Sequence, residues 1–376
     1  MGKQKLHFES LDALRFFAFL KVYLLHLPLH GDFPIFRYLK SGGGIGVAFF
    51  FVLSGFLITY LLVHDKIAYG QISLKNFFMR RSFRIWPLFY LFVILAFALP
   101  WDLKTDIGFH MVGKGYEPDW RFSFTFTENY NMLIHDNFPN TTPLGVFWSL
   151  CIEEHFYIVW MLAVFILPVR YIFGFLVSCF VVAWASRLAE PFIWHNKDIM
   201  HTTVFTNMDL FAAGGIVGYF VARHYEKFSA RLNAIPTKIK WGYVLFVLLV
   251  VVFQRHVLPS TFEYRFDVIR PTIVALLFAG VVAVFVPKNS TVRIKSKVLN
   301  YLGSISYGLY VYHIVLLHMI FRFYLDHGLM LSDWPTVGFF ILLTFGGSVL
   351  LSALSYTYVE KPFLKLREKI SGKLVR

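Results

Sequence analysis

Ionisable side chains lie inside several long apolar runs of this chain, and these residues are the ones that could do chemistry. Arg15 and His26 lie in the first run, SLDALRFFAFLKVYLLH (residues 10–26). A charged side chain at bilayer depth costs at least ~2.5–3.5 kcal/mol, so such residues usually face the protein interior and have a function. A helix would separate Arg15 from His26 by roughly 16 Å, about half the hydrocarbon thickness. We therefore expect the two residues to mark the two ends of a reaction path across a membrane.

A group of arginines precedes the third apolar run, in FFMRRSFRIWP (77–87). Arg81 and Arg84 are three residues apart, so a helix places them on one face. Together with Arg15 they would repel one another unless an anion or carboxylates accompany them, and the guanidinium group is well shaped for binding phosphate. The sequence thus predicts an anion-binding layer near one membrane face. For Arg80, anchoring at the membrane surface is an alternative.

Two adjacent carboxylates, Glu153 and Glu154, lie in WSLCIEEHFYIVW (148–160), which we place near the opposite face. Both cannot face lipid. One of them could orient and charge-stabilise the imidazole of His26, the usual arrangement for a histidine that acts as a general base. The alternative is that His26 is a packing residue. The EEH sequence lacks the HExxH spacing, so no metal site is predicted.

Several other polar features allow two interpretations. His155 could take part directly or be a hydrogen-bonded residue between helices, and His313, in ISYGLYVYHIV, could be structural or functional. The run GGGIGVAFFFVLSGFLI (42–58) could permit close helix packing or line a substrate path. No role is predicted for Lys21.

The elements that position these residues are predicted from composition and from the apolar runs. Of 376 residues, 57% are hydrophobic and only 15% are charged, whereas soluble domains carry about 25% charged residues. This composition predicts an all-α, polytopic integral membrane protein that forms one domain over residues 1–376, with no appended soluble domain. About ten transmembrane helices are expected, at 11–27, 45–63, 85–100, 146–167, 171–187, 205–222, 241–254, 268–286, 301–324 and 336–357.

The distribution of lysine and arginine predicts the orientation. Ten spans put both termini on one side, and the segments on that side hold most of the Lys and Arg, so both termini are predicted to be cytoplasmic. The net charge of +14 then reflects orientation and contact with anionic membrane lipids, and nucleic acid is not an expected partner. The longest loop, 101–143, lies on the opposite side and could meet a polar substrate.

Six motifs, in this order along the chain, resemble those of the acyltransferase 3 family of bacterial integral-membrane O-acyltransferases, of the cell-surface glycan O-acetyltransferase type. They are LDALRFFAFLKVYLLH, GVAFFFVLSGFLIT, FFMRRSFRIWPLFY, FWSLCIEEHFYIVW, LGSISYGLYVYHIV and YVEKPFLKL. The resemblance implies an enzyme of the bacterial cytoplasmic (inner) membrane that moves an acyl group, usually acetyl, from cytoplasmic acyl-CoA. The acceptor would be a sugar hydroxyl of a surface or lipid-linked glycan, such as O-antigen, exopolysaccharide or peptidoglycan.

The resemblance also implies roles for individual residues. His26 corresponds to the essential histidine of the family, which would act as general base, and Glu153 and Glu154 correspond to its paired carboxylates. Ala48 departs from the pattern, because the family often has an acidic residue there. The positions expected to hold the phosphates of acetyl-CoA are the four arginines Arg15, Arg80, Arg81 and Arg84.

The rival interpretation is a polytopic transporter, for instance an exporter of a lipid-linked saccharide. Membrane-embedded Arg and Glu residues also line transport paths. Two observations argue against it: the sequence has no two-fold repeat of helices, and the polar residues gather in the first, third and fourth predicted helices. Acyl-chain length and the choice between direct transfer and an acyl-histidine intermediate stay open.

Overall fold

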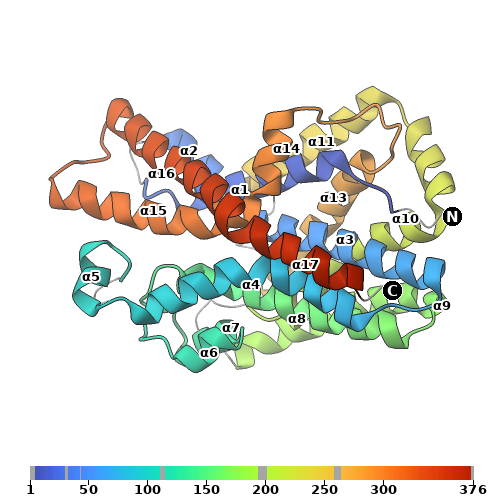
Figure 1. Cartoon of the computed structure of the whole chain (residues 1–376). Coiled ribbons are helices and arrows are strands. Elements are labelled where there is room, and N and C mark those ends of the chain that lie inside the picture. Colours follow the sequence, from blue (N-terminus) through green and yellow to red (C-terminus); the bar gives the residue numbers. More distant parts are fainter. Residues whose placement is uncertain are drawn as a thin grey trace.

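We describe residues 5–29, 33–42, 44–110, 115–193, 201–257 and 264–373 of a computed structural model of the chain (Figure 1). This described part consists of helices joined by loops, without a β-strand, which confirms the predicted all-α class. The long helices are α1 (Glu9–His26), α3 (Ile45–Tyr69), α4 (Leu74–Ala98), α8 (Leu144–Ile166), α9 (Val169–Ala189), α10 (Met208–Ala234), α11 (Thr237–Val252), α13 (Tyr264–Phe285), α15 (Ser306–Asp326), α16 (Trp334–Ser355) and α17 (Lys361–Lys373).

Short helices fill the connections. They are α2 (Pro34–Leu39), α5 (Trp101–Asp106), α6 (Trp120–Phe124), α7 (Glu128–His135), α12 (Gln254–Val257) and α14 (Lys297–Ser304), the 3-10 turns η1 (Glu190–Phe192) and η2 (Phe205–Asn207), and the π-helical η3 (Tyr356–Glu360). Three of them, α5 to α7, lie in the predicted long loop 101–143.

Eight helices in the described ranges are long and apolar enough to cross a membrane, so the protein is a multi-pass membrane protein. All ten predicted runs are helical, but two differ from the other eight. The first run, α1, is 18 residues long and keeps four charged side chains, and α11 has only 16 residues. The ninth run is divided at Ile305 into α14 and α15.

Both chain ends lie at the end of the bundle where α3 meets α4. Near the N-terminus, the Nζ of Lys5 pairs with Asp65 in the last turns of α3 at 2.8 Å. Near the C-terminus, the ring of Phe363 in α17 lies 6.4 Å from that of Phe83 in the first half of α4. The first and last described segments therefore lie at the same end of the bundle, while the prediction that both termini are cytoplasmic stays a prediction.

Helix α3 is at the centre of the bundle and packs against α1, α8, α10 and α13 (Figure 1). Its contact with α10 depends on glycines. A Cβ atom on Gly55 would lie 2.0 Å from the backbone oxygen of Phe211, and one on Gly214 would lie 1.9 Å from that of Val52. Since no side chain fits there, the two backbones touch, as small residues allow inside a membrane.

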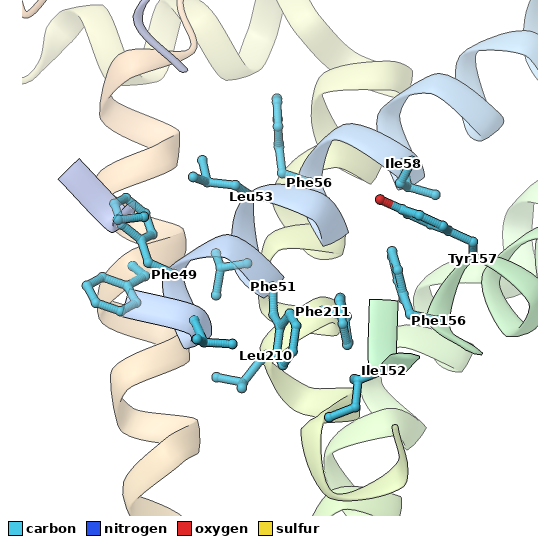
Figure 2. Packing of buried hydrophobic residues seen from close by; sticks show 14 of the residues in the cluster. Phe49, Phe51, Leu53, Phe56, Ile58, Ile152, Phe156, Tyr157, Leu210 and Phe211 are labelled. Atoms are coloured by element: carbon cyan, nitrogen blue, oxygen red, sulfur yellow. The ribbon is translucent and has the colours of Figure 1, made fainter. Parts of the chain in front are cut away.

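Aromatic rings fill the space between α3, α8 and α10 (Figure 2). The ring of Phe211 stacks on Phe156 with centroids 3.9 Å apart, and its centroid lies 4.6 Å from that of Phe51, whose ring is tilted by 30°. All three side chains are buried. This apolar wall fixes how α8 lies against α3, and it thereby positions the polar residues that both helices carry on their other faces.

The first prediction concerns the contact of α3 with α10. Replacing Gly55 with Ala should lower the free energy of unfolding by roughly 1–3 kcal/mol, because the added methyl group must push two backbones apart. Thermal unfolding of the purified protein in detergent measures the change. Gly346→Ala is the matched control, because a Cβ there meets nothing within 4 Å. Equal melting temperatures for the two variants would contradict the prediction.

Candidate active site

A cavity in the middle of the bundle is lined by side chains from α1, α3, α4, α8 and α15. It offers about 90 Å³ to the centres of water-sized molecules, room for several waters. Its polar lining consists of Arg15, Ser54, Arg81, Arg84, Ser149, Glu153, Tyr157, Ser306, Tyr307 and Tyr310. We call it the arginine cavity.

Three arginines of the sequence prediction come together in this cavity. Arg15 reaches it from α1 and donates to Asp12, one turn earlier, at 2.7 Å. The guanidinium of Arg81 lies over the rings of Phe77 and Tyr157, at 5.8 and 5.6 Å from their centroids. The Nε of Arg81 is buried and has no hydrogen-bond partner in the part of the chain that the structure describes. A buried charged donor without a partner requires an explanation, and an anionic ligand supplies one.

Glu153 belongs to the arginine cavity. Its Oε1 accepts hydrogen bonds from the hydroxyl groups of Ser54, at 2.6 Å, and Tyr157, at 2.5 Å. These partners differ from the expected contact of Glu153 or Glu154 with His26, and a catalytic role of the two carboxylates stays a prediction. Glu153 follows two and a half turns of α8, and this depth brings it level with the arginines of α4 rather than with the end of α1.

Glu154 faces a different side of α8, because successive residues in a helix point about 100° apart. It is buried, its Oε1 has no hydrogen-bond partner in the described chain, and it does not line the arginine cavity. His155 also lies away from the cavity, with its ring 5.6 Å from that of Tyr130. The packing of α8 thus separates the two adjacent carboxylates.

His26 is paired with a second histidine. Its Nδ1 lies 3.1 Å from the Nε2 of His313 in α15. The Nδ1 of His313 in turn donates to the backbone oxygen of Tyr310 at 2.6 Å. Tyr310 lines the arginine cavity and His313 lies one turn further along α15, so the histidine pair lies next to the cavity, toward the end of α1. Sequence reasoning noticed His313 in its tyrosine-rich motif but had no basis for choosing it as the partner of His26.

Arg80 does not reach the arginine cavity. It is exposed and lines a smaller hollow beside it, together with Lys5, Asp65 and Arg81. Arg81 lines both spaces. Arg81 therefore stands between the two hollows, and the smaller one lies at the end of the bundle where Lys5 pairs with Asp65.

Glu360 is a further acidic residue that sequence reasoning did not select. It is buried in the π-helical turn between α16 and α17, its Oε1 has no hydrogen-bond partner in the described ranges, and it interacts electrostatically with Arg84. π-Helical turns occur frequently at functional sites. The available signal was the motif YVEKPF, in which a carboxylate follows directly on a long apolar run.

Lys21 supports the loop that follows α2. Its Nζ donates to the backbone oxygens of Leu39 and Ser41, at 2.5 and 2.6 Å. In the opposite direction, the Nζ of Lys40 donates to the backbone oxygen of Leu27, the residue directly after His26. These bonds tie the end of α1 to the chain that leads into α3.

Comparison with known proteins supplies the decisive observation. A family model described as an acyltransferase domain matches residues 8–353, nearly the whole chain. The chain belongs to this acyltransferase family. The match includes every residue that lines the arginine cavity and both histidines of the pair, and it confirms the family resemblance that the motifs predicted.

Curated relatives of this chain have names that refer to O-acetyl transfer. The peptidoglycan O-acetyltransferase OatA of Listeria monocytogenes is 26% identical over 95% of this chain and 56% of its own length. A Bacillus subtilis protein named "Putative peptidoglycan O-acetyltransferase YrhL" is 27% identical over 95% of this chain and 55% of its own. The chain thus spans little more than half the length of these relatives. No solved structure matches it.

The second prediction concerns Lys21. Replacing it with Met should lower the free energy of unfolding by about 1–3 kcal/mol, because the carbonyl groups of Leu39 and Ser41 lose their donor where water is scarce. The melting temperature in detergent measures this loss. Lys75→Met, at an exposed position at the start of α4, should leave the melting temperature unchanged. A stable Lys21→Met protein would show that the loop is held by other contacts.

Proposed function

We propose that this protein is a membrane O-acyltransferase that moves an acyl group, most simply acetyl, from acyl-CoA to a sugar hydroxyl of a cell-envelope glycan. The observation that carries the proposal is the arrangement of two sites in a chain of the acyltransferase family. An arginine-lined cavity lies next to a pair of histidines, of which His313 is buried and His26 half-buried, and α1 joins the two sites by contributing Arg15 and His26.

Acyl-CoA is the donor that fits the arginine cavity. Its phosphates need several cations, and Arg15, Arg81 and Arg84 gather in one place, with Arg80 in the adjoining hollow. Guanidinium groups bind phosphate oxygens in bidentate fashion. The pantetheine arm is long enough to carry the thioester from this end toward the histidine pair. We place the arginine side at the cytoplasm, where acyl-CoA is made, and the protein in the bacterial cytoplasmic membrane.

The histidine pair supports His26 as the general base. The carbonyl group of Tyr310 can only accept, so the Nδ1 of His313 carries a proton, and in the neutral ring Nε2 is an acceptor. The hydrogen bond between the rings is then donated by the Nδ1 of His26. This leaves the Nε2 of His26 with a free lone pair. His313 thus supplies the orientation that we first expected from a glutamate.

The reaction at this base follows from the tautomer. The Nε2 of His26 takes the proton from the acceptor hydroxyl while the oxygen attacks the thioester carbonyl carbon. The tetrahedral intermediate then collapses, its C–S bond breaks, and the coenzyme A thiolate takes up the proton held by the imidazolium. The products are an acyl ester on the sugar and free coenzyme A. The same geometry is compatible with an acyl-histidine intermediate.

The choice of acceptor rests on the relatives. Two of them are named for peptidoglycan O-acetylation, and a glycan at the outer face of the membrane agrees with a base near the outer end of α1. Family membership favours acyl transfer over the export of a lipid-linked saccharide, the rival that membrane-embedded charges alone left open.

The third prediction concerns the histidine pair. His26→Ala should lower the rate of acetyl transfer by about 10²–10⁴-fold, the usual contribution of a general base. His313→Leu should lower it by about tenfold or more, because the Nδ1 donor of His26 loses its acceptor. Release of free coenzyme A from acetyl-CoA in the presence of a glycan acceptor measures both rates.

The control for this experiment is His155→Leu, which alters a histidine outside the cavity and should keep the activity. An active and normally inserted His26→Ala protein would refute the assignment of the base. An active His313→Leu protein would refute the pairing alone.

The fourth prediction concerns the donor. Arg81→Ala and Arg84→Ala should each weaken binding of acetyl-CoA by about 10- to 100-fold, the effect of losing a hydrogen bond to a charged group. Calorimetric titration of the purified protein measures the affinity. Arg170→Ala is the control, since Arg170 is exposed and stacks on Tyr171. Unchanged affinity in both cavity variants would place the donor elsewhere.

A further inference from the structure

A second cavity lies on the other side of α3, between α3, α10, α13 and the loop before α3. It offers about 230 Å³ to the centres of water-sized molecules, against about 90 Å³ in the arginine cavity. It lies at the start of α3, whereas the chain ends lie near the last turns of that helix. Val47 and Phe51 line both cavities, so a single layer of side chains separates them.

Gln254 contributes a polar group to the lining of this cavity, and its hydrogen-bonding capacity is not satisfied within the described chain. The side chain is only 7% exposed, and its Oε1 is buried without a hydrogen-bond partner in the described chain. The amide fits because Gly42, with φ +93°, has no side chain: a Cβ atom there would lie 1.8 Å from that oxygen. A buried amide without a partner is costly, and a ligand in the cavity would supply the missing donor.

His201 and Asn207 form a second polar part of the cavity lining, and hydrogen bonds hold both residues in place. The Nδ1 of His201 pairs with Glu190 at 2.5 Å, and its backbone N–H donates to the same carboxylate. Asn207 donates to the backbone oxygen of His201 at 2.6 Å. His201 has φ +67°, a conformation that non-glycine residues adopt rarely and mainly where the surroundings enforce it.

A buried ion pair fixes the helices that lie behind His201 and Asn207. Arg187 of α9 donates to both carboxylate oxygens of Asp209 in α10, at 2.5 and 2.9 Å, and both side chains are fully buried. Thr272 of α13 donates to the same carboxylate. Three helices are thus joined directly beside the cavity, and this gives the polar groups fixed positions.

We propose that this second cavity binds a sugar ring of the glycan acceptor, as a subsite separate from the point of acylation. The inference rests on the proposed function and adds to it the place where the acceptor is held. The aromatic surfaces of Trp148 and Phe51 suit the C–H face of a pyranose, while the amide of Gln254 suits a ring hydroxyl. A lipid chain in the same space would leave the amide oxygen unpaired.

The test measures saccharide binding directly. The full chain is reconstituted in lipid nanodiscs and titrated with two probes, an N-acetylglucosamine–N-acetylmuramic acid disaccharide and cellobiose, with saturation-transfer NMR as the readout. The wild-type protein should bind at least one probe. Gln254→Leu, similar in size but without the amide, should weaken that binding by about tenfold or more.

Gln71→Leu is the matched control, because it makes the same substitution at an exposed position in the turn between α3 and α4. It should bind like the wild type. If Gln254→Leu does not fold, Trp148→Leu takes its place and should weaken binding through loss of the aromatic surface. Unchanged or tighter binding in the folded cavity variant, or no binding of either probe by the wild type, would overturn the inference.

A parallel titration with acetyl-CoA separates this inference from the proposed function. Affinity for acetyl-CoA should be the same in the wild type, Gln254→Leu and Gln71→Leu. If saccharide binding depends on Gln254 while no variant or wild-type protein binds acetyl-CoA, the proposed function fails and the saccharide site stands. If acetyl-CoA is bound but Gln254→Leu does not change binding of the disaccharide, the saccharide site fails and the proposed function stands.

Discussion

The arrangement of this protein depends on one electrostatic constraint: three guanidinium groups share one cavity inside a bundle that lies in a membrane. Desolvated like charges repel strongly, so carboxylates must accompany them. Asp12 in α1, Glu153 in α8 and Glu360 after α16 come from three separate parts of the chain. The helices that carry these groups must therefore meet at one depth. The Nε of Arg81 still lacks a hydrogen-bond partner among the described residues, and an anionic ligand would supply one.

The proposed base, His26, is kept apart from these charges. His26 contacts a neutral partner, His313, whose tautomer is set by a backbone carbonyl group, and the residue that supplies this carbonyl also lines the arginine cavity. Such a separation has a chemical use. A carboxylate beside His26 would raise its basicity, but it would also add a negative charge where the thioester comes close in the proposed reaction. Two helices, α1 and α15, connect the arginine cavity with the proposed base, so their mutual position would determine the geometry of the proposed transfer.

The remaining packing holds these helices in place. Backbone contact between α3 and α10 at glycines, and the aromatic stack between α3, α8 and α10, set where α3 lies (Figures 1 and 2). Lys21 and Lys40 fasten the end of α1 to the loop that leads into α3. Gly55 packs against α10 while its neighbour Ser54 lines the cavity and donates to Glu153. The two interpretations of this glycine-rich run, packing and substrate path, thus apply to different faces of one helix.

The sequence by itself determined the features that depend on neighbours along the chain. Apolar length predicted the helices, and the spacing of Arg81 and Arg84 predicted that they share a face. Six motifs in order predicted the family. What the sequence left undecided was which helix faces which. His26 and His313 are 287 positions apart, and the angle of about 100° between positions 153 and 154 does not say which of the two carboxylates faces the arginine cavity. Helix register follows from local geometry, whereas partners between helices follow from how the whole bundle packs, and only the tertiary structure decided that.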